Sequence, residues 1–295
     1  MKVVTVGTVY VDIKGYPDGE FFPTGRNAGD IKYFHGGVAR NIAEDVAKLG
    51  ADSMLVSLVD KSGVASDVIK HLQDVNVRTD HVKTTEKGMG TWMAVFDGNG
   101  NLCASISRRP DLLPICDILK ADEEKIFKDA AGILLEIDID EEIVDITMRL
   151  AEKYNIPVYA VISNMTIAKE RIKYIKKTAC FFCNRLEAGI FFDKKTEGLS
   201  HQEMLDLLKT ELEKLNMKAM VITMDSDGAV YADAEGEAGH CPAQQVTVVD
   251  STGAGDAFFA GTSVGLLCKL SIADACELGT KAAASVLITR ENVLK

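Results

Sequence analysis

The stretch Val246–Leu267 is the part of the chain best suited to chemistry, because a β-branched segment leads there into a glycine-rich turn and then into a helix of small and apolar residues. Gly253 and Gly255 lack a Cβ, so the chain can turn tightly and direct successive N–H groups toward an anion. The predicted helix adds the positive end of its dipole. Such a turn binds a phosphate or the negative charge that develops during group transfer.

Asp256 falls in the first turn of that predicted helix, next to the anion-binding turn. A carboxylate is stabilised at a helix N-terminus and can accept a proton from a group held beside the anion. A simpler interpretation is that Asp256 only caps the helix. The residue alone does not decide between these two roles.

Other nucleotide motifs are excluded, and the one hydrolase-like pattern has a simpler explanation. The chain has no G-x-x-x-x-G-K-[ST] sequence, so it is not a P-loop protein, and Phe258 stands where the dinucleotide fingerprint needs its third glycine. Gly261–Gly265 matches the hydrolase pattern G-x-S-x-G, but Ser263 falls about two turns inside the predicted helix instead of at a strand-to-helix turn. Small residues that pack against a sheet explain this stretch better.

Two segments together resemble a known family. Asp250–Gly261, DSTGAGDAFFAG, resembles the C-terminal signature of the ribokinase or PfkB family of carbohydrate and nucleoside kinases, and Gly36–Ala51, GGVARNIAEDVAKLGA, resembles its N-terminal signature. They occur in the family's order and separation. The resemblance implies an ATP-dependent phosphotransferase with an alcohol group as acceptor, which uses ATP and Mg²⁺. It also implies the ribokinase-like three-layer α/β/α fold, with a central mostly parallel sheet and a small β-rich lid.

The resemblance assigns catalytic roles to the glycine-rich turn. It implies that Asp256 is the general base that takes the proton from the acceptor hydroxyl. The N–H groups of Gly253, Ala254 and Gly255 would stabilise the phosphoryl group in transfer. Phosphoryl transfer depends mainly on positioning and charge stabilisation, so this small group of residues suffices without a covalent nucleophile.

Cofactor contacts are implied at two further places. Asn184 and Glu187 resemble the family's N-x-x-E element, which holds Mg²⁺ and phosphate, in part through water. An exposed polar helix start would have the same sequence. Thr223 and Gly228 resemble the strand end and turn that contact ATP, although Asp225 replaces the glycine that usually follows the strand.

A monovalent cation is implied by the loop before the glycine-rich turn. Asp250 and Thr252 resemble the family's K⁺ site. Local capping of the turn by these two side chains is the alternative interpretation.

For the acceptor, Asp12 resembles the carboxylate that holds sugar hydroxyls, and Gly36, Gly37 and Asn41 resemble the glycine pair and amide that line the sugar pocket. A carboxylate and an amide supply the acceptors and donors that neighbouring hydroxyls need. Family members often have Asn two residues before that aspartate, where this chain has Tyr10. A structural role of Asp12 at a strand end is the alternative.

The pair Arg40-Asn41 is similar to pseudouridine kinases, which predicts phosphorylation of the 5′-hydroxyl of a nucleoside, with pseudouridine as the first candidate. The sequence around Arg108, Arg109 and Asn164 departs from those enzymes. A kinase of a free sugar, such as ribose or a keto-sugar, is therefore the alternative. A non-catalytic sugar or nucleoside sensor is a more distant one, since the complete Gly-Ala-Gly-Asp turn argues against it, and a serine hydrolase is more distant still.

Short β-branched segments alternate along the chain with longer segments of helical period. This alternation is typical of βαβ units and a mostly parallel sheet, which would position these residues. The predicted strands are Lys2–Gly7, Asp52–Leu58, Gly132–Glu136, Pro157–Val161, Ala179–Cys183 and Ala219–Thr223. The predicted helices are Val38–Leu49, Val64–Asp74, Glu141–Tyr154, Gln202–Leu215, Ala254–Cys268 and Ile272–Leu287.

Two stretches do not fit this alternation. Ile13–His35 is rich in Gly, Pro and Phe, and Gly90–Arg108 contains Asp97-Gly98-Asn99-Gly100, a strong hairpin signal between two strands. We expect both to form a β-lid of residues 13–35 and 90–108 beside an α/β kinase core of residues 1–12, 36–89 and 109–295. Lids of this family often join two subunits, so the resemblance also implies a homodimer.

Composition limits the remaining function classes. The 295 residues carry a net charge of -11 without a basic cluster, which argues against nucleic acid and anionic membranes as partners. Seven scattered cysteines without a secretory signal favour reduced thiols and a cytoplasmic protein. Cys180 and Cys183 have C-x-x-C spacing, but no second pair completes a metal site, so we expect them in a buried strand.

Overall fold

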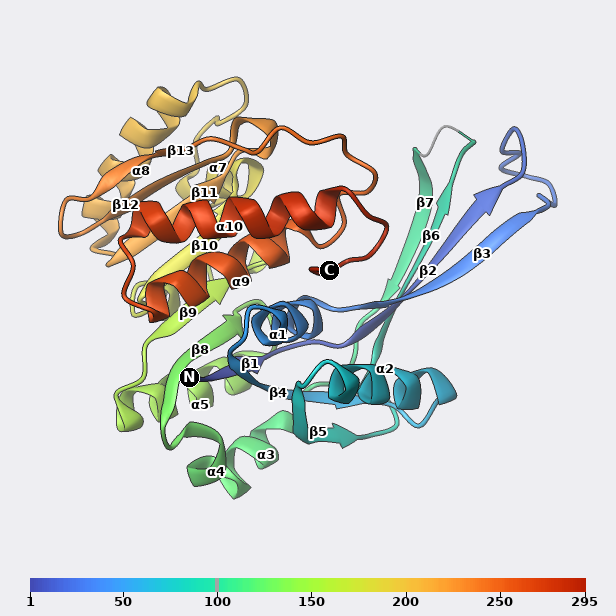
Figure 1. Ribbon diagram of the computed structural model, residues 1–295, viewed down its shortest axis with the longest axis horizontal. Coiled ribbons are helices and arrows are strands. Elements are labelled where there is room, and N and C mark those ends of the chain that lie inside the picture. The colour runs from blue at the N-terminus through green and yellow to red at the C-terminus, as the bar shows by residue number, and fades with distance from the viewer. Residues whose placement is uncertain (99–100) are drawn as a thin grey trace.

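The computed structural model describes residues 1–98 and 101–295, and its larger sheet forms the centre of the molecule (Figure 1). Within the described residues this sheet has the strands β1 Lys2–Val6, β4 Asp52–Val59, β5 Arg78–Thr84, β8 Ala130–Glu136, β9 Val158–Val161, β10 Cys180–Asn184, β11 Ala219–Thr223, β12 Ala229–Asp233 and β13 Ala238–Cys241. Their order is β13-β12-β11-β10-β9-β8-β1-β4-β5. Neighbours from β5 to β11 pair in parallel, and β12 and β13 add an antiparallel edge.

Helices cover both faces of this sheet, which explains its apolar strands. On one face lie α1 Val38–Lys48, α2 Gly63–Asp74, α9 Ala254–Leu267 and α10 Ile272–Leu287. On the other lie α3 Ile115–Ala121, α5 Glu141–Tyr154, α7 Arg185–Phe192 and α8 His201–Leu215, with the short helices α4 Glu123–Phe127 and α6 Ile172–Ile175 beside them. Val3 and Val4 of β1 face opposite helix layers and are both fully buried. Parallel strands buried on both faces have this continuous apolar character.

A second, four-stranded sheet projects from one end of the main sheet (Figure 1). It consists of β2 Tyr10–Pro17, β3 Gly29–Gly36, β6 Gly90–Phe96 and β7 Leu102–Arg108, in the order β3-β2-β6-β7. β6 and β7 pair antiparallel, as the hairpin signal predicts, while Asn99 and Gly100 of that signal lie outside the described residues. This small sheet is the lid, and it extends from the carboxyl end of β1.

The three-layer α/β/α fold with a lid is confirmed. The predicted strands and helices are all present, with ends that differ by at most one residue for the long helices α1, α2 and α8. The pattern did not predict β5, β12 or β13, because the edge strand β5 has a single buried residue and β12 and β13 form an antiparallel hairpin at the other side of the sheet. Cys180 and Cys183 lie buried on β10 as free thiols, and Ser263 is buried in the middle of α9.

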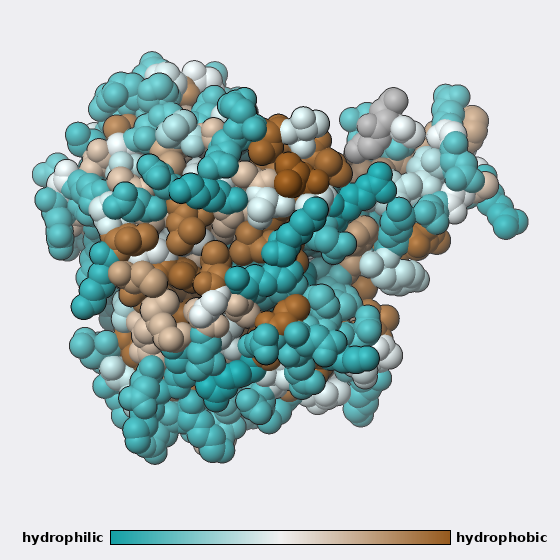
Figure 2. Space-filling view, in the orientation of Figure 1, coloured by the Kyte–Doolittle hydropathy of each residue, from teal (hydrophilic) through white to brown (hydrophobic). Residues whose placement is uncertain are grey.

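The outer surface on the α9 and α10 side is largely hydrophilic, with hydrophobic residues exposed between and beside these two helices (Figure 2). In the part of the chain that the structure describes, no helix combines the length and apolar character needed to cross a membrane.

Candidate active site

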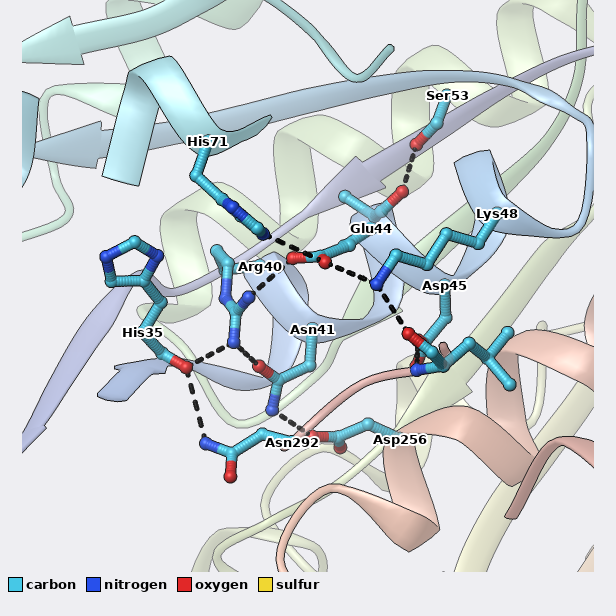
Figure 3. A network of polar contacts seen from close by, with 12 residues as sticks. His35, Arg40, Asn41, Glu44, Asp45, Lys48, Ser53, His71, Asp256 and Asn292 are labelled. Carbon is cyan, nitrogen blue, oxygen red and sulfur yellow. Dashed lines mark hydrogen bonds and ion pairs between the residues drawn. The ribbon is translucent and has the colours of Figure 1, made fainter. Parts of the chain in front are cut away.

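The predicted catalytic aspartate and the predicted pocket amide meet where α1 and α9 begin. Asn41, in the first turn of α1, donates a hydrogen bond of 2.7 Å from Nδ2 to Oδ2 of Asp256, in the first turn of α9 (Figure 3). The two residues are 215 positions apart in the chain. Both helices start at the end of the main sheet from which the lid extends. The fold thus joins the two signature segments into one site.

Asp256 is a half-buried carboxyl whose proton affinity is altered by its surroundings. Burial raises its pKa to about 6, and the nearby carboxylate of Asp12 adds to this, while the Asn41 hydrogen bond and the Arg40 charge oppose it. At neutral pH most of the group is ionised, yet its pKa lies close to the working pH. This is the property that a general base needs.

The glycine-rich turn has the geometry of an anion site beside Asp256. Gly253, the residue before α9, has φ 84°, and a Cβ there would lie 2.0 Å from the carbonyl oxygen of Asn292. The Ala254 N–H donates to the Ser251 carbonyl at 3.3 Å, so it is used within the turn. At Gly255 a Cβ would meet no heavy atom within 4 Å. First-turn N–H groups have no partner inside a helix, so this open space beside Gly255 suits an anion.

Asp12 lies on β2 with its carboxylate against Gly36, the first of the two glycines that precede α1. A Cβ on Gly36 would lie 2.6 Å from both carboxylate oxygens, so any side chain there would displace Asp12. Gly37 has φ 99° and packs against the backbone of Thr8, 2.6 Å from a Cβ position. Burial raises the pKa of Asp12 to about 6, and the charges of Lys14 and Arg40 oppose this rise.

Arg40 orients the amide of Asn41. Its guanidinium is 2% exposed and donates to the side-chain oxygen of Asn41 and to the His35 carbonyl (Figure 3). With its oxygen held by Arg40, Asn41 directs its NH₂ group to Asp256. Arg40 therefore fixes the orientation of the Asn41 amide that contacts Asp256.

Glu44 neutralises Arg40 from the same helix. Arg40 Nη1 lies 2.7 Å from Oε2 of the fully buried Glu44, whose Oε1 lies 2.8 Å from Lys48 Nζ and 3.0 Å from His71 Nε2. Burial raises the pKa of Glu44, but these three partners outweigh it and leave the pKa below its ordinary value. The buried guanidinium thus has a compensating charge, without which its burial would be costly.

Two further polar residues near the candidate site were not singled out from the sequence. Asn292, near the C-terminus and 3% exposed, donates to Asp12 Oδ2 at 3.4 Å and to the His35 carbonyl at 3.3 Å. Glu136, at the carboxyl end of β8, accepts hydrogen bonds from the Thr8 N–H and hydroxyl, each at 2.8 Å. Burial, with repulsion from Asp138, raises the pKa of Glu136 to about 8. The only available hint for Glu136 was a carboxylate at the end of an apolar strand.

A cavity of about 240 Å³ opens beside Glu136. Its lining is mostly polar and includes Thr8, Tyr10, Arg109, Glu136, Asp138, Asp140, Ser163 and Arg171. Tyr10 starts the lid strand that carries Asp12, and Arg109 follows the last lid strand. The cavity therefore lies where the lid joins the main sheet, beside the start of the strand that carries Asp12.

The predicted N-x-x-E element is a capping box at the start of α7. Asn184 Oδ1 accepts from the Glu187 N–H at 2.8 Å, and Glu187 Oε2 accepts from the Asn184 N–H at 2.7 Å. Burial raises the pKa of Glu187 to about 7, and the Asp138 charge adds to this. Across the described residues no three His, Cys, Asp or Glu side chains form a metal-binding group. Glu187 and Asp138 are a carboxylate pair that a water-ligated Mg²⁺ would fit.

Thr223 is the last residue of β11, and Gly228 lies in the turn that follows it. Gly228 has φ 90°, and a Cβ there would lie 2.1 Å from the Cys241 carbonyl oxygen. Asp225, which replaces the usual glycine, has φ 51°. The backbone thus keeps the left-handed conformation that favours glycine, which aspartate tolerates better than most residues.

Asp250 and Thr252 precede the glycine-rich turn and contact each other. Asp250 Oδ1 accepts from the Thr252 hydroxyl at 2.7 Å and from its N–H at 2.9 Å. The other carboxylate oxygen lies 3.1 Å from Nζ of Lys14, a lid residue that is 1% exposed. Local capping and a cationic partner therefore occur together at this loop.

Comparisons with known proteins agree on one family and one fold. A family profile described as pfkB family carbohydrate kinase matches residues 1–293. The chain is 32% identical to a guanosine-inosine kinase of Exiguobacterium acetylicum, over 99% of this chain and 96% of that protein. It is 26% identical to a pseudouridine kinase of Escherichia coli K12, over 88% and 82%. The structure of Arabidopsis thaliana ribokinase with ribose and ATP superposes with a TM-score of 0.85 at 18% identity, over 99% and 95%.

Proposed function

The chain belongs to the pfkB family of carbohydrate kinases, and on that premise we propose that it transfers the γ-phosphoryl group of ATP to the 5′-hydroxyl of a nucleoside, with Asp256 as general base. The family makes it an ATP-dependent phosphotransferase for sugars or nucleosides. The single observation that carries the proposed mechanism is the contact between Asn41 and Asp256, with Asp12 buried close by. One carboxylate can then hold hydroxyls while the other takes a proton.

The roles of the residues follow from their contacts. Asp12 and Asn41 hold the ribose hydroxyls, as an acceptor and a donor that neighbouring hydroxyls can both use. The acceptor oxygen then lies at Asp256, which takes its proton as the new bond to the γ-phosphorus forms and the bond from that phosphorus to the leaving ADP breaks. The open space beside Gly255 receives the transferring phosphoryl group, where the α9 dipole and N–H groups offset its charge.

ATP and Mg²⁺ supply the phosphoryl group and the charge neutralisation that this transfer needs. Glu187 and Asp138 are the carboxylates that would hold Mg²⁺, because they repel each other without a cation. Thr223 and the Gly228 turn would contact ATP along the same edge of the sheet.

A nucleoside suits the site better than a free sugar. Trp92 of β6 pairs with Asp12 of β2 in the lid, so both side chains lie on the same face of that sheet. An aromatic ring next to the hydroxyl-binding carboxylate is suited to stacking on a base. The polar cavity lined by Tyr10, Arg109 and Glu136 offers both donors and acceptors for base edges. Free ribose would leave these groups unpaired.

Among nucleosides, guanosine and inosine are the first candidates. The relative named a guanosine-inosine kinase is more similar over more of the chain than the one named a pseudouridine kinase. The similarity of Arg40-Asn41 to pseudouridine kinases supports pseudouridine as the second candidate. In this chain Arg40 also orients Asn41, the amide that contacts the proposed general base Asp256. This role does not depend on which nucleoside binds.

The lid has a further proposed role on each of its faces. Residues 13–35 and 90–108 would close over the acceptor and exclude water.

The lid face opposite Asp12 and Trp92 presents Tyr33, Met93 and Ile106, which are all exposed and lie in one cross-strand row. We infer that this face joins two subunits. A molecular mass equal to that of one chain, measured by light scattering, would contradict the homodimer.

The test is a comparison of kcat/KM for guanosine, inosine, pseudouridine, uridine, cytidine, ribose and fructose with Mg-ATP. We expect a purine nucleoside to exceed both free sugars by at least about tenfold, since a pocket built to pair with a base rejects a ligand that lacks it. If a free sugar exceeds every nucleoside by tenfold, the nucleoside assignment is wrong and the kinase assignment stands. In parallel, fluorescence of Trp92, the chain's only tryptophan, should change when the preferred nucleoside binds.

A further inference from the structure

The loop that resembles a K⁺ site already has a cation of the protein's own. Lys14 extends from lid strand β2 and places Nζ 3.1 Å from Asp250 Oδ2 and 3.2 Å from the Thr252 hydroxyl oxygen. Its ammonium also lies 4.9 Å from the centre of the Phe34 ring. Lys14 is 1% exposed, so the carboxylate, the hydroxyl and the ring face are partners of a buried ammonium group that has three N–H donors.

These contacts conflict with an alkali cation at the same loop. Of the two carboxylate oxygens of Asp250, one is held by Thr252 and the other by Lys14. A K⁺ ion beside Asp250 Oδ2 would have to displace the ammonium or stand next to it, and two adjacent cations repel. The residues present therefore do not fit a monovalent metal ion at Asp250 and Thr252.

We propose that the Lys14 ammonium is a tethered replacement for the alkali cation, so this kinase reaches full activity without K⁺. The proposal rests on the proposed role of the turn at Gly253–Asp256, which begins directly after Thr252. The ammonium fixes the loop from which that turn starts, and it brings positive charge close to where phosphoryl charge develops. Because β2 also carries Asp12, the same strand holds the acceptor and braces the anion turn.

The first measurement needs only the unmodified protein. Initial rates with Mg-ATP are compared in potassium chloride and in tetramethylammonium chloride at equal ionic strength. We expect the two rates to agree within about twofold. Stimulation of about tenfold or more by potassium would overturn the proposal.

The second measurement uses Lys14→Met, with Lys32→Met as its matched control. Lys32 lies directly opposite Lys14 on β3 but is partly exposed, and its only described ion pair is with the exposed Asp30. In tetramethylammonium, Lys14→Met should lose at least about tenfold in kcat/KM, and potassium should restore part of the loss, while Lys32→Met keeps its activity. Full activity of a folded Lys14→Met without potassium would refute the role of Lys14.

The third measurement does not depend on activity or on the acceptor. Thallium(I), a K⁺ mimic that is easily located by anomalous scattering, is soaked into crystals of the unmodified protein and of Lys14→Met. We expect thallium between Asp250 and Thr252 in the variant only. Thallium at Asp250 in the unmodified protein would overturn the proposal, even if the variant fails to fold or the acceptor proves to be a sugar.

Discussion

Replacing Asp256 with Asn should lower activity and raise stability at the same time. The amide has nearly the shape of the carboxylate but cannot take the acceptor proton, so kcat should fall by about 10²-fold or more. Stability should move the other way because the folded protein holds Asp256 ionised at a cost. Its pKa is about 6, against 3.8 for an ordinary aspartate. That difference corresponds to about 3 kcal/mol for a fully buried group. Partial exposure of Asp256 reduces the expected gain to about 1–2 kcal/mol.

The stability gain has a defined pH window. A carboxyl whose pKa is raised in the folded state binds its proton more tightly there than in the unfolded chain, so its ionisation destabilises the fold. The cost is fully present above pH 6, declines between pH 6 and pH 4, and is absent below that range. Asp256→Asn should therefore exceed the unmodified protein in melting temperature by about 2–4 °C at neutral pH, and the difference should vanish in acid.

Thermal unfolding followed by circular dichroism across this pH range tests the expected gain in stability, and ADP release assays test the expected loss of activity. Asp274→Asn is the matched control, because Asp274 occupies the same helical position in the first turn of α10 as Asp256 does in α9, but is exposed. The control should keep full activity and lose a little stability through its weakened cap. A folded Asp256→Asn that is less stable than the unmodified protein at neutral pH, or that loses less than tenfold in kcat, would refute the reasoning.

Four further outcomes follow from the same contacts. Gly36→Ala should raise KM for the acceptor by about tenfold or more at similar KM for ATP, since its Cβ would lie 2.6 Å from the Asp12 oxygens; equal KM values would contradict this. The rate should fall below about pH 6 more steeply than the binding of one proton allows, because Asp12 and Asp256 both have a pKa of about 6 and both must be ionised. A midpoint near pH 4 would exclude these two carboxyl groups as the cause of the acid limb. Asn41→Ala should move this acid limb to higher pH, since the lost hydrogen bond raises the pKa of Asp256 further; an unmoved limb would separate Asn41 from the base. Glu187→Gln should need several-fold more Mg²⁺ for half-maximal rate, and an unchanged Mg²⁺ dependence would remove Glu187 from the metal site.

The sequence predicted the parts of the candidate site that depend on the backbone of a few neighbouring residues. The turn at Gly253 and the glycine before α1 were recognisable because their backbone has conformations or contacts that a side chain would prevent. Asp225 shows the limit of that signal, since the left-handed conformation persists there with another residue in place of glycine.

Contacts between distant segments could not be predicted in the same way. Lys14 resembles any lysine of a lid strand until the fold brings Asp250, 236 positions later, against its ammonium. Asn292 is one polar residue among several near the C-terminus, and only packing against Gly253 brings it to Asp12. Their roles depend on burial and charge pairing created by the tertiary fold, which has no short-range pattern.

Identification of the reaction product is the most direct test of phosphoryl transfer to a nucleoside 5′-hydroxyl. Phosphorus-31 NMR of the protein with Mg-ATP and guanosine or inosine should show ADP and a nucleoside 5′-monophosphate appearing in equal amounts, with no such signals from Asp256→Asn over the same time. If no nucleoside, pseudouridine included, yields a 5′-monophosphate while a free sugar yields a sugar phosphate, the account of the acceptor is contradicted.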